Sequence, residues 1–92
     1  MRKQVKDFWR GRVLTDERKD YARRKRRVFR VAAAGVERER LFECYKALDD
    51  RKCDEVTVWF YDTPEEIERG LPYTVAMIER TGRRAVPVLT YR

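Results

Sequence analysis

The residues of this chain that could do chemistry are mainly basic ones, and most of them lie in its first third. Residues 1–30 hold 13 basic and 4 acidic residues, whereas residues 31–92 hold 10 basic and 12 acidic residues. The densest part is an unbroken run of five basic residues over positions 23–27. Each arginine or lysine that neutralises a phosphate releases a counterion, so such a run binds polyanions whatever their sequence. The charge distribution therefore indicates an interaction segment for nucleic acid or a similar polyanion.

Aromatic rings interleave with cations just before this run. Phe8 and Trp9 precede Arg10 and Arg12, and rings that lie among cations can stack on unpaired bases. The alternative is that Phe8 and Trp9 anchor the segment to the rest of the protein while the arginines are solvated. The residues expected to bind nucleic acid or a partner are Trp9, Arg10, Arg12, Arg23, Arg24, Lys25, Arg26, Arg27 and Arg30.

Catalytic chemistry has little support in the residue types. The chain has no histidine, which excludes catalytic pairs and metal ligands that depend on an imidazole. Cys44 and Cys53 are too few for a four-thiolate zinc site, and we expect both to be reduced thiols. The paired acids Asp49 and Asp50 fall at a predicted helix end, where acids are common for structural reasons. We therefore expect no enzymatic activity, no catalytic or metal-binding residue and no cofactor.

The elements that must position the cations fall into two parts. We expect a basic N-terminal arm over residues 1–27, partly helical, followed by a single α+β domain over residues 28–92. Within the arm, Thr15 followed by two acids is typical of a helix start, which predicts a helix over residues 16–26. This helix has too few apolar side chains to pack, so we expect it to depend on binding for its stability.

Phe8 and Trp9 are expected to dock the arm on the domain. Two adjacent apolar rings in so charged a segment are otherwise fully exposed to water. We expect them to be partly buried on the sheet face that carries Trp59 and Tyr61.

The domain is predicted to contain a small mixed sheet. Residues 28–34 and 55–62 are apolar in the manner of strands. Between them, Leu41, Tyr45 and Leu48 recur at helical spacing, which predicts an amphipathic helix whose apolar side packs on the sheet.

A short helix is predicted after the second strand. Thr63 is a capping residue, Pro64 suits the first helical position, and Glu66 completes a capping box. Gly70 and Pro72 then end the helix. The expected order is strand, helix, strand, short helix and β-hairpin.

The last twenty residues have two possible structures. Residues 73–91 form a hairpin with a turn at Thr81-Gly82, or residues 72–81 form a second helix, which gives a βαβαβ order. The β-branched residues of this segment favour the hairpin. In both cases Pro87 places the last strand at a sheet edge.

Three segments of the domain resemble a known group of proteins. They are Val-Thr-Val-Trp-Phe-Tyr-Asp over residues 56–62, Tyr-Thr-Val-Ala over 73–76 and Ile-Glu-Arg-Thr-Gly over 78–82. The chain is similar here to small bacterial and phage-borne α+β domains of unknown function. In that group a helix is followed by a strand ending in Phe-Tyr, a variable loop and a terminal hairpin. The resemblance spans residues 28–92 and implies the hairpin, but it implies no activity.

The sequence thus predicts a small non-enzymatic binding protein whose basic arm engages nucleic acid or a nucleoprotein complex. The alternative is a protein-interaction module, such as a phage-encoded inhibitor of a bacterial defence nucleoprotein, with a partner that presents an acidic surface. The longest apolar runs are six residues, far shorter than a membrane span, and the first residues have no secretory signal pattern. We therefore expect a cytoplasmic protein with no membrane partner. The sequence leaves the oligomeric state open.

Overall fold

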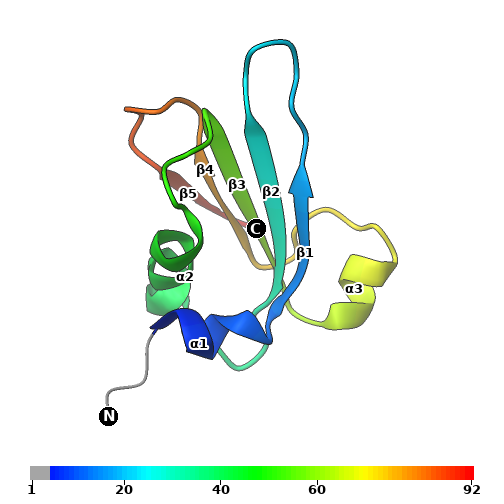
Figure 1. Cartoon of the computed structure of the whole chain (residues 1–92). Helices are drawn as coiled ribbons and strands as arrows, with labels where there is room; N and C mark the ends of the chain where they lie inside the picture. Colours follow the sequence, from blue (N-terminus) through cyan, green and yellow to red (C-terminus); the bar gives the residue numbers. More distant parts are fainter. Residues whose placement is uncertain (1–4) are drawn as a thin grey trace.

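Strand β3 (Glu55–Tyr61) is the centre of a five-stranded sheet in the computed structural model, which describes residues 5–92 and their side chains from Phe8 onward. The strands lie in the order β1-β2-β3-β4-β5 (Figure 1). Only the β2–β3 pair is parallel, and the other three pairs are antiparallel. The remaining strands are β1 (Val13–Arg18), β2 (Arg26–Ala32), β4 (Ala76–Arg80) and β5 (Val88–Tyr91). The protein is therefore a mixed α+β domain, as the sequence predicted.

Two helices cover one face of the sheet. Helix α2 (Leu41–Leu48), preceded by the 3₁₀ turn η1 (Arg38–Arg40), connects the parallel strands β2 and β3. Helix α1 (Val5–Arg10) packs against α2 (Figure 1). Their inward side chains meet one side of the alternating strands, because successive side chains of a strand point to opposite faces. The core of this face includes Leu41, Cys44, Tyr45, Val56, Val58, Phe60 and Ile78.

A short helix lies near the C-terminal ends of β2 and β3. Helix α3 (Pro64–Glu68) begins with the predicted capping box between Thr63 and Glu66, which is confirmed. Its Ile67 is buried, and so is Tyr61, whose hydroxyl donates a hydrogen bond of 2.7 Å to the carbonyl of Leu71.

The helix predicted over residues 16–26 is wrong. Residues 13–18 form β1, which pairs with β2 across a tight hairpin. The acids that resembled a helix cap bind cations on the neighbouring strand instead: Asp16 binds Arg27 and Glu17 binds Arg30. Strand pairing satisfies the backbone and pairs these charges, whereas an isolated helix with few apolar side chains gains neither.

The predicted division between an arm and a domain also differs from the structure. The boundary at residues 27 and 28 falls inside β2, and the basic segment from residue 13 onward belongs to the sheet. The predicted order of elements consequently lacked α1 and β1. Residues 1–4 of the predicted arm lie outside the described residues.

The burial predicted for Phe8 and Trp9 is confirmed, but the predicted face is wrong. Trp9 is fully buried and Phe8 is half-buried. They pack on the side of α2, not on the side of Trp59 and Tyr61, because α1 lies along α2 and shares the main apolar core. The indole N–H of Trp9 donates to Glu43 at 3.4 Å.

The terminal hairpin is confirmed. Strands β4 and β5 pair antiparallel, so the alternative helix over residues 72–81 is wrong. Residues 74–78 favour extended structure through their β-branched side chains, and the central strand offers them a partner. Strand β5 is at a sheet edge, as Pro87 predicted.

The two cysteines are both buried and neither is in a disulfide. No helix in the described part of the chain is long and apolar enough to cross a membrane.

Candidate nucleic-acid interface

The sheet topology brings three loops to one end of the molecule. Residues 19–25 join β1 to β2, residues 49–54 lead from α2 into β3, and residues 81–87 join β4 to β5. Strands β2 and β3 are parallel, so both begin at this end, and the antiparallel neighbours β1 and β4 therefore finish there. These three loops, which we call the basic end, hold eight basic and four acidic residues. The basic ones are Lys19, Arg23, Arg24, Lys25, Arg51, Lys52, Arg83 and Arg84.

Backbone hydrogen bonds tie the first two loops together. The amide of Lys25 donates to the carboxylate of Asp54 at 2.7 Å. In return, the amides of Asp54 and Glu55 donate to the carbonyl of Lys25 at 2.8 and 3.1 Å. These bonds extend the β2–β3 pairing beyond the strands, so the two loops keep a fixed relative position.

The buried side chain of Arg80 connects the second and third loops through hydrogen bonds. Its guanidinium is fully buried and bonds both oxygens of Asp49, at 2.7 and 3.1 Å. Its remaining N–H groups donate to the carbonyls of Cys53, Asp54 and Gly82. All five donors of the guanidinium therefore have acceptors. A single side chain of β4 thus fixes residues 49–54 against residue 82.

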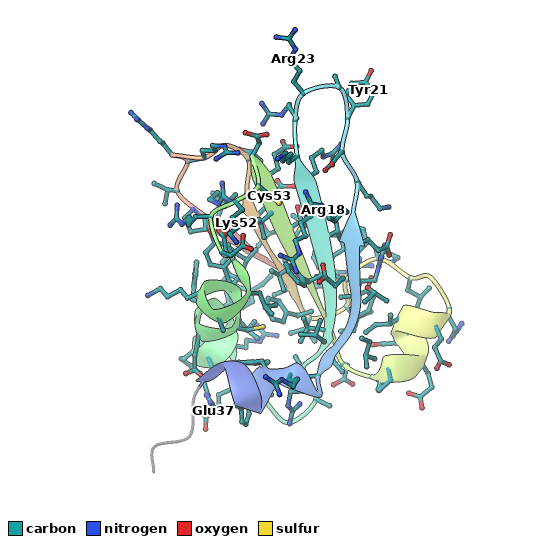
Figure 2. The ribbon with its side chains drawn as sticks, viewed as in Figure 1. Arg18, Tyr21, Arg23, Glu37, Lys52 and Cys53 are labelled. Atoms are coloured by element: carbon teal, nitrogen blue, oxygen red, sulfur yellow. The ribbon has the colours of Figure 1, made fainter. Side chains whose placement is uncertain are left out.

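The β1–β2 hairpin projects furthest at the basic end. Its tip is a two-residue loop in which Tyr21 and Arg24 exchange backbone hydrogen bonds of 3.0 and 2.9 Å around Ala22 and Arg23. Ala22 has a φ of 55°, the left-handed conformation that tight hairpins require. Figure 2 shows Tyr21 and Arg23 at the tip, pointing away from the sheet. The ring of Tyr21 is 73% exposed.

Four cations of the basic end have no partner among the described residues. The side chains of Arg23, Lys25, Lys52 and Arg84 are in exposed residues and make no ion pair or hydrogen bond with the described part of the chain. They come from all three loops. They are therefore the charges that an approaching anion meets without having to displace a protein carboxylate.

The other predicted cations of the 23–30 segment are paired within the protein. Arg24 and Arg26 both reach Glu55, at 3.4 and 2.9 Å, and Arg24 also donates to the carbonyl of Thr81. Arg27 forms a two-point contact with Asp16 at 2.6 and 2.8 Å. The hydrogen bond from Arg27 lowers the pKa of Asp16, so this acid is charged at neutral pH.

Arg30 lies away from the basic end. It binds Glu17 and lies over the ring of Trp59, 5.2 Å from the ring centre. Because its register partner is Trp59, in the middle of β3, it is distant from the loops at the strand ends.

The predicted binding residues near the N-terminus, Trp9, Arg10 and Arg12, lie outside the basic end. Trp9 is buried in the core, and a buried ring cannot stack on a base, so this part of the prediction is wrong. Arg12 donates to the carbonyls of Ala32 and Ala34 at 3.4 and 3.0 Å. Arg10 is exposed and lies at the opposite end of β1 from the hairpin tip.

Five of the eight cations of the basic end were not predicted from the sequence, because single or paired cations far apart in the sequence carry no local signal. They are Lys19, Arg51, Lys52, Arg83 and Arg84. The missing information was the parallel pairing of β2 and β3, which places the three loops together. Tyr21 was also missed, because it was assigned to a helix.

Asp49 and Asp54, two acids of these loops, stay charged at neutral pH. Hydrogen bonds from the backbone of Lys25 and from Arg83 lower the pKa of Asp54. Burial alone raises the pKa of Asp49, but hydrogen bonds from Arg80 and Tyr45 outweigh it and leave the pKa below its usual value. The acids of the basic end therefore serve as internal partners that position its cations.

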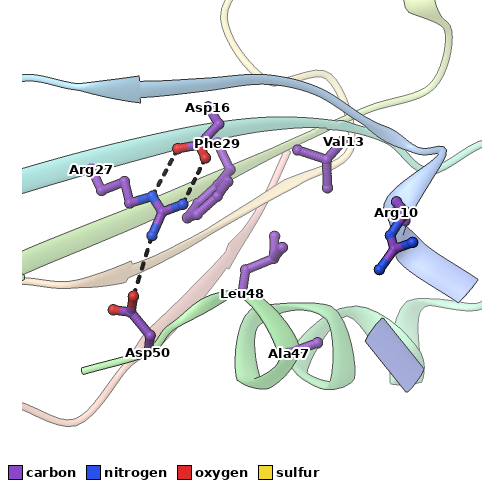
Figure 3. Close-up of a pocket in the computed structure, with 8 residues that line it drawn as sticks. All are labelled: Arg10, Val13, Asp16, Arg27, Phe29, Ala47, Leu48 and Asp50. Atoms are coloured by element: carbon purple, nitrogen blue, oxygen red, sulfur yellow. Dashed lines mark hydrogen bonds and ion pairs between the residues drawn. The ribbon is translucent and has the colours of Figure 1, made fainter. Parts of the chain in front are cut away.

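A separate cavity of about 360 Å³ lies between the β1–β2 hairpin and the C-terminal part of α2 (Figure 3). Val13, Phe29 and Leu48 give it an apolar lining. Arg27 crosses it and is held by Asp16 on one side and Asp50, at 3.5 Å, on the other. Because both acids neutralise Arg27, this arginine is not available to bind an anion in the cavity.

The cysteine and acidic side chains of the described residues form no candidate metal site. No group of three or more cysteine, aspartate or glutamate side chains there is placed to hold a metal ion. Burial raises the pKa of the Cys44 thiol far above its usual value, so it is an unreactive core residue.

Comparisons with protein-family models, with curated proteins and with solved structures find no match for this chain.

Proposed function

We propose that this protein is a non-enzymatic binding protein whose basic end engages nucleic acid, either alone or within a nucleoprotein complex. The observation that carries the proposal is the convergence of Arg23, Lys25, Lys52 and Arg84 from three loops, none with an acidic partner in the described part of the chain. Unpaired cations gain most from a polyanion, because a phosphate replaces only water and counterions around them.

The rigidity of the basic end supports the same function. Arg80 and the reciprocal bonds between Lys25 and Asp54 fix the loops, so binding orders few backbone segments. The entropy cost of association is smaller for a preorganised surface. The projecting hairpin adds an exposed ring, Tyr21, that can stack on an unpaired base.

Phosphate contacts of this kind position a protein without reading sequence. We therefore expect similar affinity for oligonucleotides of different sequence. We expect the affinity to fall with salt, with a log–log slope of about −0.9 for each phosphate contact on duplex DNA.

The test uses two paired variants of the basic end and a matched control. Arg23→Gln with Lys25→Gln removes two charges from the hairpin, and Lys52→Gln with Arg84→Gln removes two from the other loops. Lys46→Gln with Arg69→Gln removes two exposed charges elsewhere, from the last turn of α2 and from the end of α3. Fluorescence anisotropy with a 20-base-pair duplex is measured over a range of salt concentrations.

Each basic-end variant should reduce the magnitude of the salt slope by about 1.8, because two phosphate contacts are lost. The control variant should leave the slope unchanged. Equal effects of all three variants would show that only the net charge matters, and absence of binding at low salt would refute the proposal.

A pull-down from lysate, with and without nuclease treatment, tests the protein-partner alternative. Loss of all partners after nuclease treatment supports direct binding of nucleic acid. A protein partner that survives nuclease and is lost in the Arg23→Gln, Lys25→Gln variant supports the inhibitor alternative instead.

A further inference from the structure

The two edges of the sheet differ in how they are protected against pairing with another strand. Strand β1 is one edge and β5 is the other (Figure 1). Charged side chains keep an exposed edge from pairing with other chains. β1 has three of them, Asp16, Glu17 and Arg18, whereas Val88–Tyr91 has none. The β5 edge is therefore the one without charged side chains, although the strand is short and follows Pro87.

Exposed apolar side chains are concentrated at the β5 edge. Val86 is 80% exposed, Val88 is 60% exposed and Tyr91 is 46% exposed. The only other large apolar residues exposed in the described part of the chain are Leu14 and Tyr21, which lie apart from one another. Val88 and Tyr91 are three residues apart on β5, so they lie on opposite faces of the sheet and an added strand can contact one with each of its faces. Exposed apolar groups along one edge are typical of an interaction site.

The hydrogen-bond pattern shows which backbone groups of β5 are available. The amide of Arg92 donates to the carbonyl of Val75 at 3.0 Å, so this pair is a hydrogen-bonded one. Hydrogen-bonded and non-hydrogen-bonded pairs alternate in an antiparallel ladder. Given the observed register, Thr90 and Val88 therefore bond to β4, whereas the N–H and C=O groups of Leu89 and Tyr91 point outward.

The charged side chains on and flanking β5 in the sequence are all basic. Residues 81–92 contain three arginines and no acidic residue. Arg84 precedes the exposed strand and Arg92 follows it, and the guanidinium of Arg38 lies over the ring of Tyr91, 4.9 Å from its centre. The one acid of β4, Glu79, is opposite Val88 and lies one strand inward from the edge.

We propose that the β5 edge binds an extended, acidic peptide segment of a partner protein, which adds to the sheet as a sixth strand. The outward groups of Leu89 and Tyr91 bond to its backbone, and Val86, Val88 and Tyr91 contact its apolar side chains. Acidic residues at its two ends lie near Arg84 and Arg92. Strand addition to a sheet edge is a general mode of peptide recognition.

The positive charge flanking β5 also favours a partner protein over a second copy of this chain. Two copies that pair through β5 bring together two edges that carry only positive charges, and like charges across an interface are unfavourable. An acidic segment has the opposite sign. The proposed surface shares Arg84 and Val86 with the basic end, but strand addition to β5 does not depend on nucleic-acid binding.

The test uses two synthetic peptides of nine residues with blocked ends. In both, the seven residues between the ends are valines and threonines arranged so that valine occurs on both faces of the extended peptide. The terminal residues are glutamates in one peptide and lysines in the other. We expect the glutamate peptide to bind about ten-fold more tightly at low salt, through two attractive contacts in place of two repulsive ones. Arg92→Glu should remove most of this preference while leaving nucleic-acid binding unchanged.

Amide hydrogen exchange locates the contact. The glutamate peptide should slow exchange at Leu89 and Tyr91, whereas Val88 and Thr90, already bonded to β4, should change little. Equal affinity for the two peptides, or no binding at millimolar concentration, would overturn the proposal. So would a dimer in sedimentation velocity that the exposed-edge variant Val88→Lys converts to monomer, because a second copy would then occupy the edge.

Discussion

Arg80 and Asp49 form a buried, two-point ion pair that connects the last residue of β4 to the end of α2. The two side chains are 0% and 2% exposed, and their closest atoms, Arg80 Nε and Asp49 Oδ2, are 2.7 Å apart. The same guanidinium also binds three backbone carbonyls of the basic end. This pair therefore joins the apolar core to the loops that carry the unpaired cations.

Removing one member of this pair should strongly destabilise the protein. Arg80→Met leaves Asp49 buried without its partner and three carbonyls without their donor, at a cost of about 3–5 kcal/mol. Chemical denaturation monitored by tryptophan fluorescence measures the change. Replacing both residues with leucine removes the uncompensated charge, so Asp49→Leu with Arg80→Leu should recover a large part of the loss. If the double variant is no more stable than Arg80→Met, the uncompensated charge is not the cause.

Stability should decline in acid partly through Asp49. Its pKa is below the usual value in the folded protein, because hydrogen bonds from Arg80 and Tyr45 outweigh burial. The folded state thus holds fewer protons at this site than the unfolded state. The contribution is fully present above the unfolded pKa of about 4 and is lost as the pH falls through the folded pKa. Asp49→Asn should therefore show a shallower loss of unfolding free energy below pH ~4 than the unmodified protein. Parallel pH profiles for the two proteins would contradict this assignment.

A glycine at the hairpin tip should stabilise the protein. Ala22 has a φ of 55°, which is unfavourable for a residue with a Cβ atom. Ala22→Gly should raise the free energy of unfolding by about 0.5–1 kcal/mol, since relief of strain exceeds the added freedom of the unfolded chain. Ala34→Gly is the matched control, because Ala34 is exposed and has no positive φ. The control should be slightly destabilised, and equal effects at both positions would show that strain at Ala22 is not responsible.

Both cysteines should resist thiol reagents in the folded protein. Cys44 is fully buried, with a raised pKa, and Cys53 is 2% exposed. Labelling with a chromogenic disulfide at neutral pH should therefore proceed only at the rate of unfolding, and both thiols should react in denaturant. Rapid reaction of one thiol in native buffer would show that its segment opens locally.

Local sequence patterns predicted the elements whose structure depends mainly on their own residues. Alternating apolar residues predicted β3, helical spacing predicted α2, and the Thr63 capping box predicted α3. β1 was missed because Thr15, Asp16 and Glu17 are equally compatible with a helix cap, and pairing with β2 decides between the two structures. Propensity is overridden by tertiary context in such segments.

The candidate interface was only partly predictable for the same reason. The basic run showed that residues 23–27 were candidates, but the carboxylates that neutralise Arg26 and Arg27 are distant in the sequence. The inward position of Arg80 follows from its spacing of two residues from the buried Ile78, but its partner Asp49 lies 31 residues away. Pairings of this kind require the fold.

If the basic end binds nucleic acid as proposed, the width of the five-stranded sheet sets the footprint that it can cover. Its loops occupy the ends of all five strands, and neighbouring strands are about 4.8 Å apart, so the row of loops is about 19 Å wide. Base pairs of duplex DNA are spaced by about 3.4 Å, so this width corresponds to about six base pairs, or little more than half a helical turn. One molecule bound in the proposed way would therefore reach the phosphates on a single side of a duplex. A longer duplex offers more places to bind and leaves the strength of each encounter unchanged.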